Sequence, residues 1–111
     1  MLKNDELRIR HIIDAAEEAI AFCSNRSRQD LHQDRMLNLS LVRLLEIIGE
    51  AARGISPEFR NSHPEIVWKK MAGLRDRLIH GYFDVNLDVV WETVTEDLPP
   101  MVAKLRDIVA V

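Results

Sequence analysis

Residues 36–52, Met-Leu-Asn-Leu-Ser-Leu-Val-Arg-Leu-Leu-Glu-Ile-Ile-Gly-Glu-Ala-Ala, decide the fold class of this chain. Their apolar side chains recur every three or four residues, which is the spacing of one face of an α-helix. Gly54 follows as a helix-ending residue that tolerates positive φ. The stretch therefore predicts an amphipathic helix whose buried face consists of Leu37, Leu41, Leu44, Leu45, Ile48, Ala51 and Ala52.

The same period continues on both sides of this stretch. Residues 2–24 predict a first helix, with Ile9, Ile12, Ile13, Ala16, Ile20 and Cys23 on one stripe. Residues 24–35 are polar and predict a loop or a poorly packed start of the next helix. After Gly54, Ser56 and Pro57 predict the cap and first turn of a short helix.

The next segment, residues 64–82, is expected to form one helix with Gly81 as its C-cap. Gly73 lies inside it, where glycine costs about 1 kcal/mol against alanine. A close approach of another helix would explain this glycine, and a break in the helix is the competing account.

A further helix should begin at a cap provided by Asn86 or Asp88. It is interrupted at Pro99-Pro100, which must kink or divide it before a last segment at 101–111. The β signal in residues 85–90 is too brief to outweigh the helical context. Trp68 and Trp91 are expected to help fill the core. The prediction is an all-α bundle of four or five helices, folded as one domain over residues 1–111.

Composition narrows the class of protein. The 111 residues are 47% apolar and 30% charged, which is ordinary for a soluble globular domain. The single cysteine, Cys23, lies on the apolar stripe and is read as a core residue, so a reducing, cytoplasmic setting is expected. The N-terminus lacks the apolar run of a signal peptide, and no stretch approaches the length of a membrane span.

The charge balance limits binding to nucleic acid. A formal net charge of −3 argues against a general nucleic-acid coat, because non-specific affinity comes largely from neutralising phosphates. A local basic site remains open, because Lys69, Lys70, Arg75 and Arg77 lie close together with only Asp76 to offset them. The sequence thus permits a small cationic cleft on an acidic protein.

Residues 75–82, Arg-Asp-Arg-Leu-Ile-His-Gly-Tyr, are the segment best suited to chemistry. His80 can exchange protons near neutral pH, and Arg75 keeps its charge and offers a planar fork to phosphate. In an ideal helix these two side chains point roughly 140° apart, whereas Asp76 and His80 share a face. In an unbroken helix Arg75 and Tyr82 would also be neighbours. This geometry favours a site completed by a second surface, such as a partner subunit with its own copy of the segment.

Structural roles are the alternative for each of these residues. His80 could satisfy the end of a helix, the charged cluster could be a solvated face, and Tyr82 could be a packing contact. Metal chemistry has little support, because the four histidines are scattered without metal-ligand spacing. Glu46 and Glu50 could form a carboxylate pair, but they lack the histidine partner of a di-metal motif.

At this point the chain resembles a known family. Arg75-x4-His80-x-Tyr82 matches the RX4HXY signature of the HepT-like toxins, which belong to the HEPN superfamily of small helical ribonucleases. The stretches Ile47–Ala52, Pro64–Lys69 and Val90–Pro99 are similar to segments typical of those proteins at the expected spacings.

The resemblance implies a homodimer that sets two copies of the motif together in a cleft and cleaves RNA without metal. It implies that His80 is the acid/base group, that Arg75 holds the scissile phosphate, and that Asp76 orients one of the two. Lys69, Lys70 and Arg77 would give supporting RNA contacts.

The family also implies regulation by a partner. Its toxins belong to type II toxin–antitoxin systems, and the partner is a minimal nucleotidyltransferase (MntA-like) antitoxin. That antitoxin would use ATP to transfer AMP to Tyr82, and the toxin itself would need no cofactor. Two alternatives remain at this stage: a non-catalytic helical module that binds the nucleotidyltransferase, and a plain bundle in which the motif only stabilises the dimer.

Overall fold

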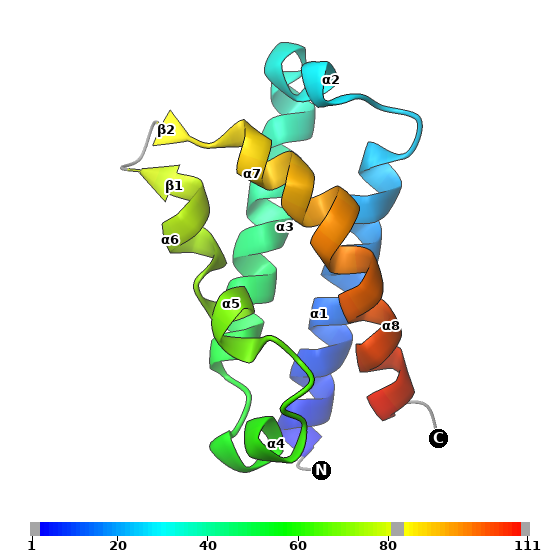
Figure 1. Cartoon of the computed structure of the whole chain (residues 1–111), viewed down its shortest axis with the longest axis vertical. Coiled ribbons are helices and arrows are strands. Elements are labelled where there is room, and N and C mark those ends of the chain that lie inside the picture. The colour runs from blue at the N-terminus through cyan, green and yellow to red at the C-terminus, as the bar shows by residue number, and fades with distance from the viewer. Residues whose placement is uncertain (1–2, 81–83, 110–111) are drawn as a thin grey trace.

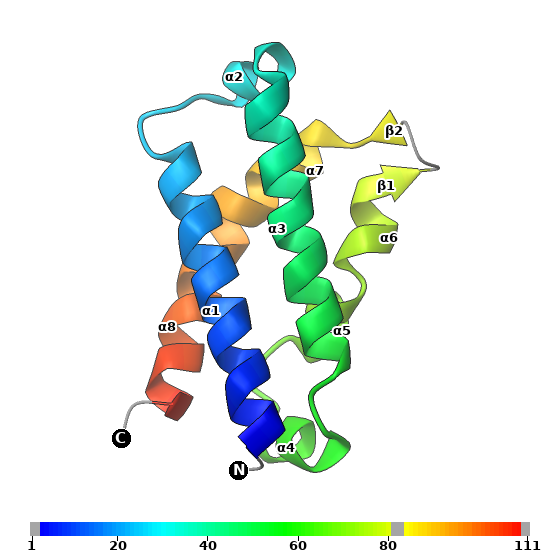
Figure 2. The same ribbon diagram turned by 180° about the vertical axis from the view of Figure 1, so that it is seen from behind.

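The two longest helices lie side by side and antiparallel in the computed structural model, which describes residues 3–80 and 84–109. They are α1 (Lys3–Cys23) and α3 (Arg35–Arg53) (Figure 1, Figure 2). The stripes predicted from the sequence face each other between them, and Ile9, Ile12, Leu41, Leu45 and Ile48 are completely buried. The prediction of an all-α fold is therefore confirmed.

A third long rod crosses the face of this pair that is turned to the viewer in Figure 1. It is made of α7 (Leu87–Glu92), the π-helical turn η1 (Thr93–Asp97) and α8 (Leu98–Val109). Asn86 caps its start by accepting a hydrogen bond from the Val89 amide at 3.1 Å, as one of the two predicted caps. Burial of Val90, Val94, Leu98, Val102 and Leu105 holds the rod against the core.

The interruption expected at Pro99-Pro100 takes the form of the π turn just before them. A proline has no N–H, so it cannot donate to the regular helical ladder behind it. The ladder widens over Thr93–Asp97, and the Leu98 amide donates to the Thr93 carbonyl five residues back. The two prolines then lie in the first turn of α8, and the rod continues instead of separating into two helices.

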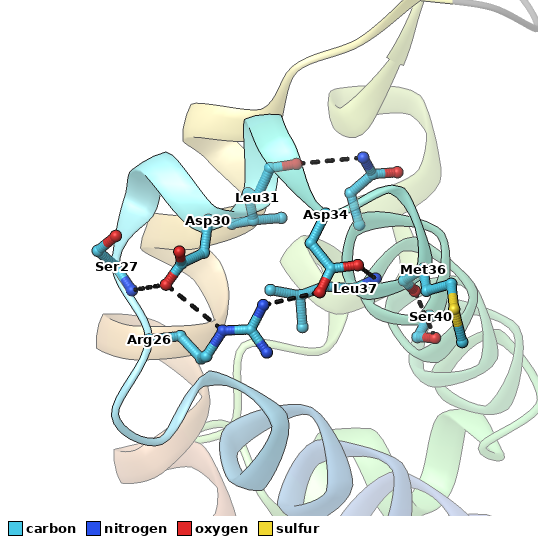
Figure 3. A network of polar contacts seen from close by, with 9 residues as sticks. Arg26, Ser27, Asp30, Leu31, Asp34, Met36, Leu37 and Ser40 are labelled. Atoms are coloured by element: carbon cyan, nitrogen blue, oxygen red, sulfur yellow. Dashed lines mark hydrogen bonds and ion pairs between the residues drawn. The ribbon is translucent and has the colours of Figure 1, made fainter.

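The polar stretch after α1 is better ordered than predicted. It contains α2 (Arg28–Gln33), which buries Leu31. Asp30 accepts from the Ser27 amide at 2.8 Å, while Asp34 accepts from Arg26 at 2.8 Å and caps α3 through the Leu37 amide at 3.1 Å (Figure 3). These carboxylates join the end of α1 to the start of α3.

The lower end of the bundle is held by a buried carboxylate. Asp5 in α1 is almost fully buried and accepts from both the amide (2.8 Å) and the hydroxyl (2.7 Å) of Ser56. Ser56 in turn caps α4 (Pro57–Ser62), as predicted, by accepting from the Phe59 amide. Gly54 ends α3, but its φ of −82° shows that positive φ is not the reason for this glycine.

The segment predicted as one helix over residues 64–82 is three shorter elements. They are α5 (Trp68–Ala72), α6 (Leu74–Leu78) and β1 (Ile79–His80), which pairs antiparallel with β2 (Asp84–Val85). Gly73 marks a break between α5 and α6, so the competing account of this glycine is confirmed. Ile79 caps α6, so this helix ends before the predicted cap, Gly81, which lies outside the described residues.

The close approach between two helices occurs at Gly49 in α3 and not at Gly73. At Gly49 in α3, an added Cβ would lie 3.1 Å from the Met71 carbonyl oxygen of α5. Glycine there lets α5 pack its backbone against α3 and places α6 beside the same helix. Trp68 is buried, with its indole N–H donating to the His63 carbonyl at 2.9 Å, whereas Trp91 is only partly buried.

Within the described residues, no helix is long and apolar enough to cross a membrane.

Candidate functional site

Three charged residues of the motif project from α6 into solvent. The apolar residues of this one-and-a-half-turn helix, Leu74 and Leu78, are buried against the core. Their burial fixes the helix rotation, so Arg75, Asp76 and Arg77 are all exposed. The sequence therefore anchors the segment from within and leaves its charged side chains exposed to solvent.

Arg75 lies beside α3, where its nearest acidic partner is Glu46. The Arg75 Nε and Glu46 Oε2 atoms are 3.8 Å apart, and the side chains are 66% and 23% exposed. This separation is longer than a hydrogen bond, and an exposed ion pair of this kind contributes little stability. The guanidinium makes no hydrogen bond to any residue that the structure describes, so its donors can meet an anion.

Among the described side chains, the ion-pair partner of Asp76 is Arg53. The Asp76 carboxylate lies 3.8 Å from Nη2 of Arg53, near the end of α3. Arg53 also donates from Nε to the Ala72 carbonyl at 3.0 Å, just before the break at Gly73. One arginine thus holds the end of α5 and faces Asp76 on α6.

The predicted helical geometry around His80 is wrong because α6 ends at Leu78. The chain turns to extended conformation at Ile79, with φ −115° and ψ 119°. His80 lies opposite Asp84 in the hairpin, and the Asn86 amide donates to the Leu78 carbonyl at 2.8 Å. The 140° angle between Arg75 and His80, and the face shared by Asp76 and His80, therefore do not apply.

Tyr82, the predicted site of modification, lies outside the described residues.

The four predicted cations do not converge on one cleft of the protomer. Arg75 lies on the α3 side of α6, whereas Arg77 and Lys70 line a groove on the other side, between α5–α6 and η1–α8. Lys70 pairs there with Asp97 at 3.4 Å. Lys69 and Lys70 both line a wide, open hollow beside Trp68, which neither Arg75 nor Arg77 reaches. Within one protomer, the small cationic cleft that the sequence permitted is absent among the described residues.

The carboxylate pair considered for metal binding is also separated. Glu46 faces Arg75, while Glu50 lies 3.8 Å from Arg43. No three histidine, cysteine, aspartate or glutamate side chains gather into a possible metal site in residues 3–80 and 84–109. Cys23 is buried as predicted, and burial raises the pKa of its thiol.

Sequence reasoning missed Glu46 and Arg53 as partners of the motif. Both belong to the polar flank of the α3 stripe, seven residues apart and therefore on the same side of the helix. That spacing of opposite charges was the only signal available in the sequence. It identifies a charged flank but not the helix that packs beside it.

The chain is similar to known proteins of one family. The family described as "Ribonuclease HepT-like" matches residues 12–108. A "putative RNase" of Caldanaerobacter subterraneus subsp. tengcongensis is 37% identical over 96% of both chains. A "probable ribonuclease HepT" of Thermococcus cleftensis is 40% identical over 88% of this chain and 89% of its own.

A "putative RNase" of Methanocaldococcus jannaschii is 39% identical over 79% of this chain and 81% of its own. No solved structure matches the chain. The family match spans most of the chain and includes α3, α6 and both strands of the hairpin that carries His80. The chain therefore belongs to the HepT-like ribonuclease family.

Proposed function

We propose that this protein is the toxin of a type II toxin–antitoxin system and acts as a metal-independent RNA endonuclease. The observation that carries the proposal is the placement of Arg75. Its guanidinium is exposed and only loosely paired with Glu46, and it precedes the helix-to-strand turn that leads to His80. Relatives named as ribonucleases support the same reaction class.

The reaction is attack of an RNA 2′-hydroxyl on the adjacent phosphate. The P–O bond to the 5′-oxygen of the next nucleotide breaks as the new bond forms, leaving a cyclic phosphate and a free 5′-hydroxyl. His80 transfers the proton, and Arg75 stabilises the negative charge that develops on the phosphate. Asp76, facing Arg53, helps to orient the motif.

The site is shared between two chains in this proposal. Within one protomer the described cations are spread over different sides of α5 and α6, so a second copy is needed to bring more of them to one substrate. In a symmetric dimer each surface meets its own copy, which doubles the local positive charge.

Regulation acts through Tyr82. A nucleotidyltransferase antitoxin transfers AMP from ATP to the phenol and releases pyrophosphate. The attached adenylate places a bulky anion beside the motif, where it blocks RNA and competes for Arg75. Mass spectrometry after incubation with the cognate antitoxin and ATP is expected to show adenylate on the wild type and none on Tyr82→Phe.

The catalytic assignment is tested with RNA and excess EDTA. His80→Ala and Arg75→Ala are each expected to lower the cleavage rate by about 100-fold or more, since each removes a group that acts in the transition state. Arg10→Ala, which removes an exposed arginine paired with Glu6 on α1, is the matched control and should cleave normally.

Loss of all cleavage in EDTA, with recovery on adding metal, would refute metal independence. A wild-type chain that never cleaves RNA but still binds the antitoxin would show instead that the protein is a non-catalytic binding module.

A further inference from the structure

A groove separates the motif helix from the π turn. It lies between α5–α6 and η1–α8, and its volume is about 200 Å³. The floor is formed by buried apolar side chains, among them Met71, Leu74, Leu98 and Met101. This groove is distinct from the Arg75–Glu46 surface, because it opens on the other side of α6.

Thr93, a residue that lines the groove, has a buried hydroxyl without a partner. Thr93, the first residue of the π turn, is 2% exposed, and its Oγ1 makes no hydrogen bond within the described part of the chain. Helical hydroxyls elsewhere in the protein bond the carbonyl four residues back, as Ser40, Ser62 and Thr95 do at 2.7–2.9 Å. Buried polar groups are rarely left unpaired, and a turn about Cα–Cβ to the other common rotamer would bring this hydroxyl to the groove, where a ligand can supply the partner.

The rim offers both donors and acceptors. Lys70 and Asp97 pair with each other, and Glu65 lies 3.3 Å from His63. The remaining charged groups around the groove are Arg77, Lys104 and Glu96. A rim of mixed sign does not suit a bare phosphate, but it suits a ring whose edge carries both donors and acceptors.

We propose that this groove binds one unpaired nucleobase of the RNA, beside the phosphate held at Arg75. The inference rests on the proposed function and specifies a single-stranded substrate. A cavity of about 150 Å³ accepts benzene, so the groove is large enough for a heteroaromatic ring. The methionines pack against the ring, and the Thr93 hydroxyl, turned into the groove about Cα–Cβ, bonds its edge.

The positions of Arg75 and Arg77 on α6 suit an RNA strand that crosses this helix. Arg75 and Arg77 are two residues apart on α6, so their side chains leave the helix on opposite flanks. An RNA strand crossing α6 can then present one phosphate to Arg75 while an adjacent base, turned out of its stack, enters the groove near Arg77. Splayed single-stranded bases are the usual targets of RNA-binding proteins.

Methionine methyl NMR tests the proposal on the intact wild-type protein. Met71 and Met101 line the groove, whereas Met36 is 80% exposed on α3 and serves as an internal control. Titration with the four nucleoside 5′-monophosphates, one at a time, is expected to shift the first two signals for at least one nucleotide. The signal of Met36 should stay in place, and ribose 5-phosphate should leave all three unchanged.

A pair of variants checks the hydroxyl. Thr93→Val keeps the shape, is expected to weaken nucleotide binding about 5-fold through one lost hydrogen bond, and should melt at the same or a higher temperature. Thr95→Val is the matched control, because the Thr95 hydroxyl bonds the Trp91 carbonyl outside the groove. Equal binding by Thr93→Val and the wild type would overturn the role of the hydroxyl.

The remaining outcomes separate this inference from the proposed function. Shifts without any RNA cleavage would support the groove and refute the nuclease. Cleavage without shifts, or equal shifts with ribose 5-phosphate, would overturn the groove alone. Shifts of Met71 and Met101 caused only by the antitoxin would also overturn it and identify the groove as a protein-docking surface.

Discussion

Glu46 shows how a residue outside the motif can set the strength of substrate binding. It places a half-buried negative charge 3.8 Å from Arg75, the cation assigned to the phosphate. The carboxylate orients the guanidinium and also competes with an incoming phosphate. Removal of this charge should therefore strengthen the binding of phosphate and weaken the orientation of the Arg75 guanidinium.

We expect Glu46→Gln to lower KM for RNA several-fold at low salt and to lower kcat as well. The gain in binding should shrink as salt rises, because screening weakens the attraction between Arg75 and phosphate. Steady-state cleavage at several salt concentrations measures both effects. Glu50→Gln, one turn along α3 and facing Arg43, is the control; an equal change in KM from both variants would contradict a specific Glu46–Arg75 pair.

The Arg75 environment could be predicted from the sequence only in part. Arg75 is exposed, which agrees with the reading of residues 75–77 as a solvated face and leaves its predicted role in RNA cleavage as a prediction. Its partners could not be identified, because Glu46 and Arg53 reach α6 only through the packing of α5 and α6 against α3. That packing depends on Gly49, whose close contact with the Met71 carbonyl leaves no trace in helical periodicity.

At the level of elements, helices supported by long apolar stripes were predicted well and short ones were not. The prediction failed at residues 79–80 because their conformation depends on pairing with residues 84–85. It underestimated α2 because that helix is stabilised by capping carboxylates and one buried leucine instead of a stripe. The periodicity of apolar residues predicts the long helices, whereas the short elements depend on tertiary contacts that this periodicity does not show.

The carboxylates around α2 make this corner sensitive to acid. The hydrogen bond from Arg26, followed by that from the Leu37 amide, lowers the pKa of Asp34, and the Ser27 amide chiefly lowers that of Asp30. A carboxyl group with a lowered folded pKa stabilises the fold above its unfolded value of about 3.9, and this contribution is lost as pH falls through the folded pKa. The corner should therefore weaken below about pH 4.

We expect Arg26→Met to raise the pKa of Asp34 and to flatten the fall in melting temperature between about pH 4 and pH 2, since less stability remains to be lost. Carboxyl-carbon NMR titration and thermal unfolding followed by circular dichroism measure the two effects. Arg10→Met removes an exposed ion pair on α1 and should leave the titration of Asp34 unchanged. An unchanged titration in Arg26→Met would refute the assigned cause.

For the whole molecule, the sequence predicted the helical bundle because three apolar stripes can bury themselves only against one another. A single helix through residue 82 would have pointed Arg75 and His80 apart and so favoured a shared site. In the structure, α6 ends at Leu78. The described cations instead lie on separate sides of the protomer, which favours a substrate held by two chains.

Mixing two inactive variants distinguishes a shared site from one contained in a single chain. In a heterodimer of Arg75→Ala with His80→Ala, one composite site keeps Arg75 from one protomer and His80 from the other. Equal mixing with free exchange should restore about a quarter of wild-type activity, because half the dimers are mixed and each contains one intact site of two. Cleavage after denaturing and refolding the variants together measures this recovery. A mixture as inactive as either variant, in dimers verified by light scattering, would show that each site draws Arg75 and His80 from the same chain.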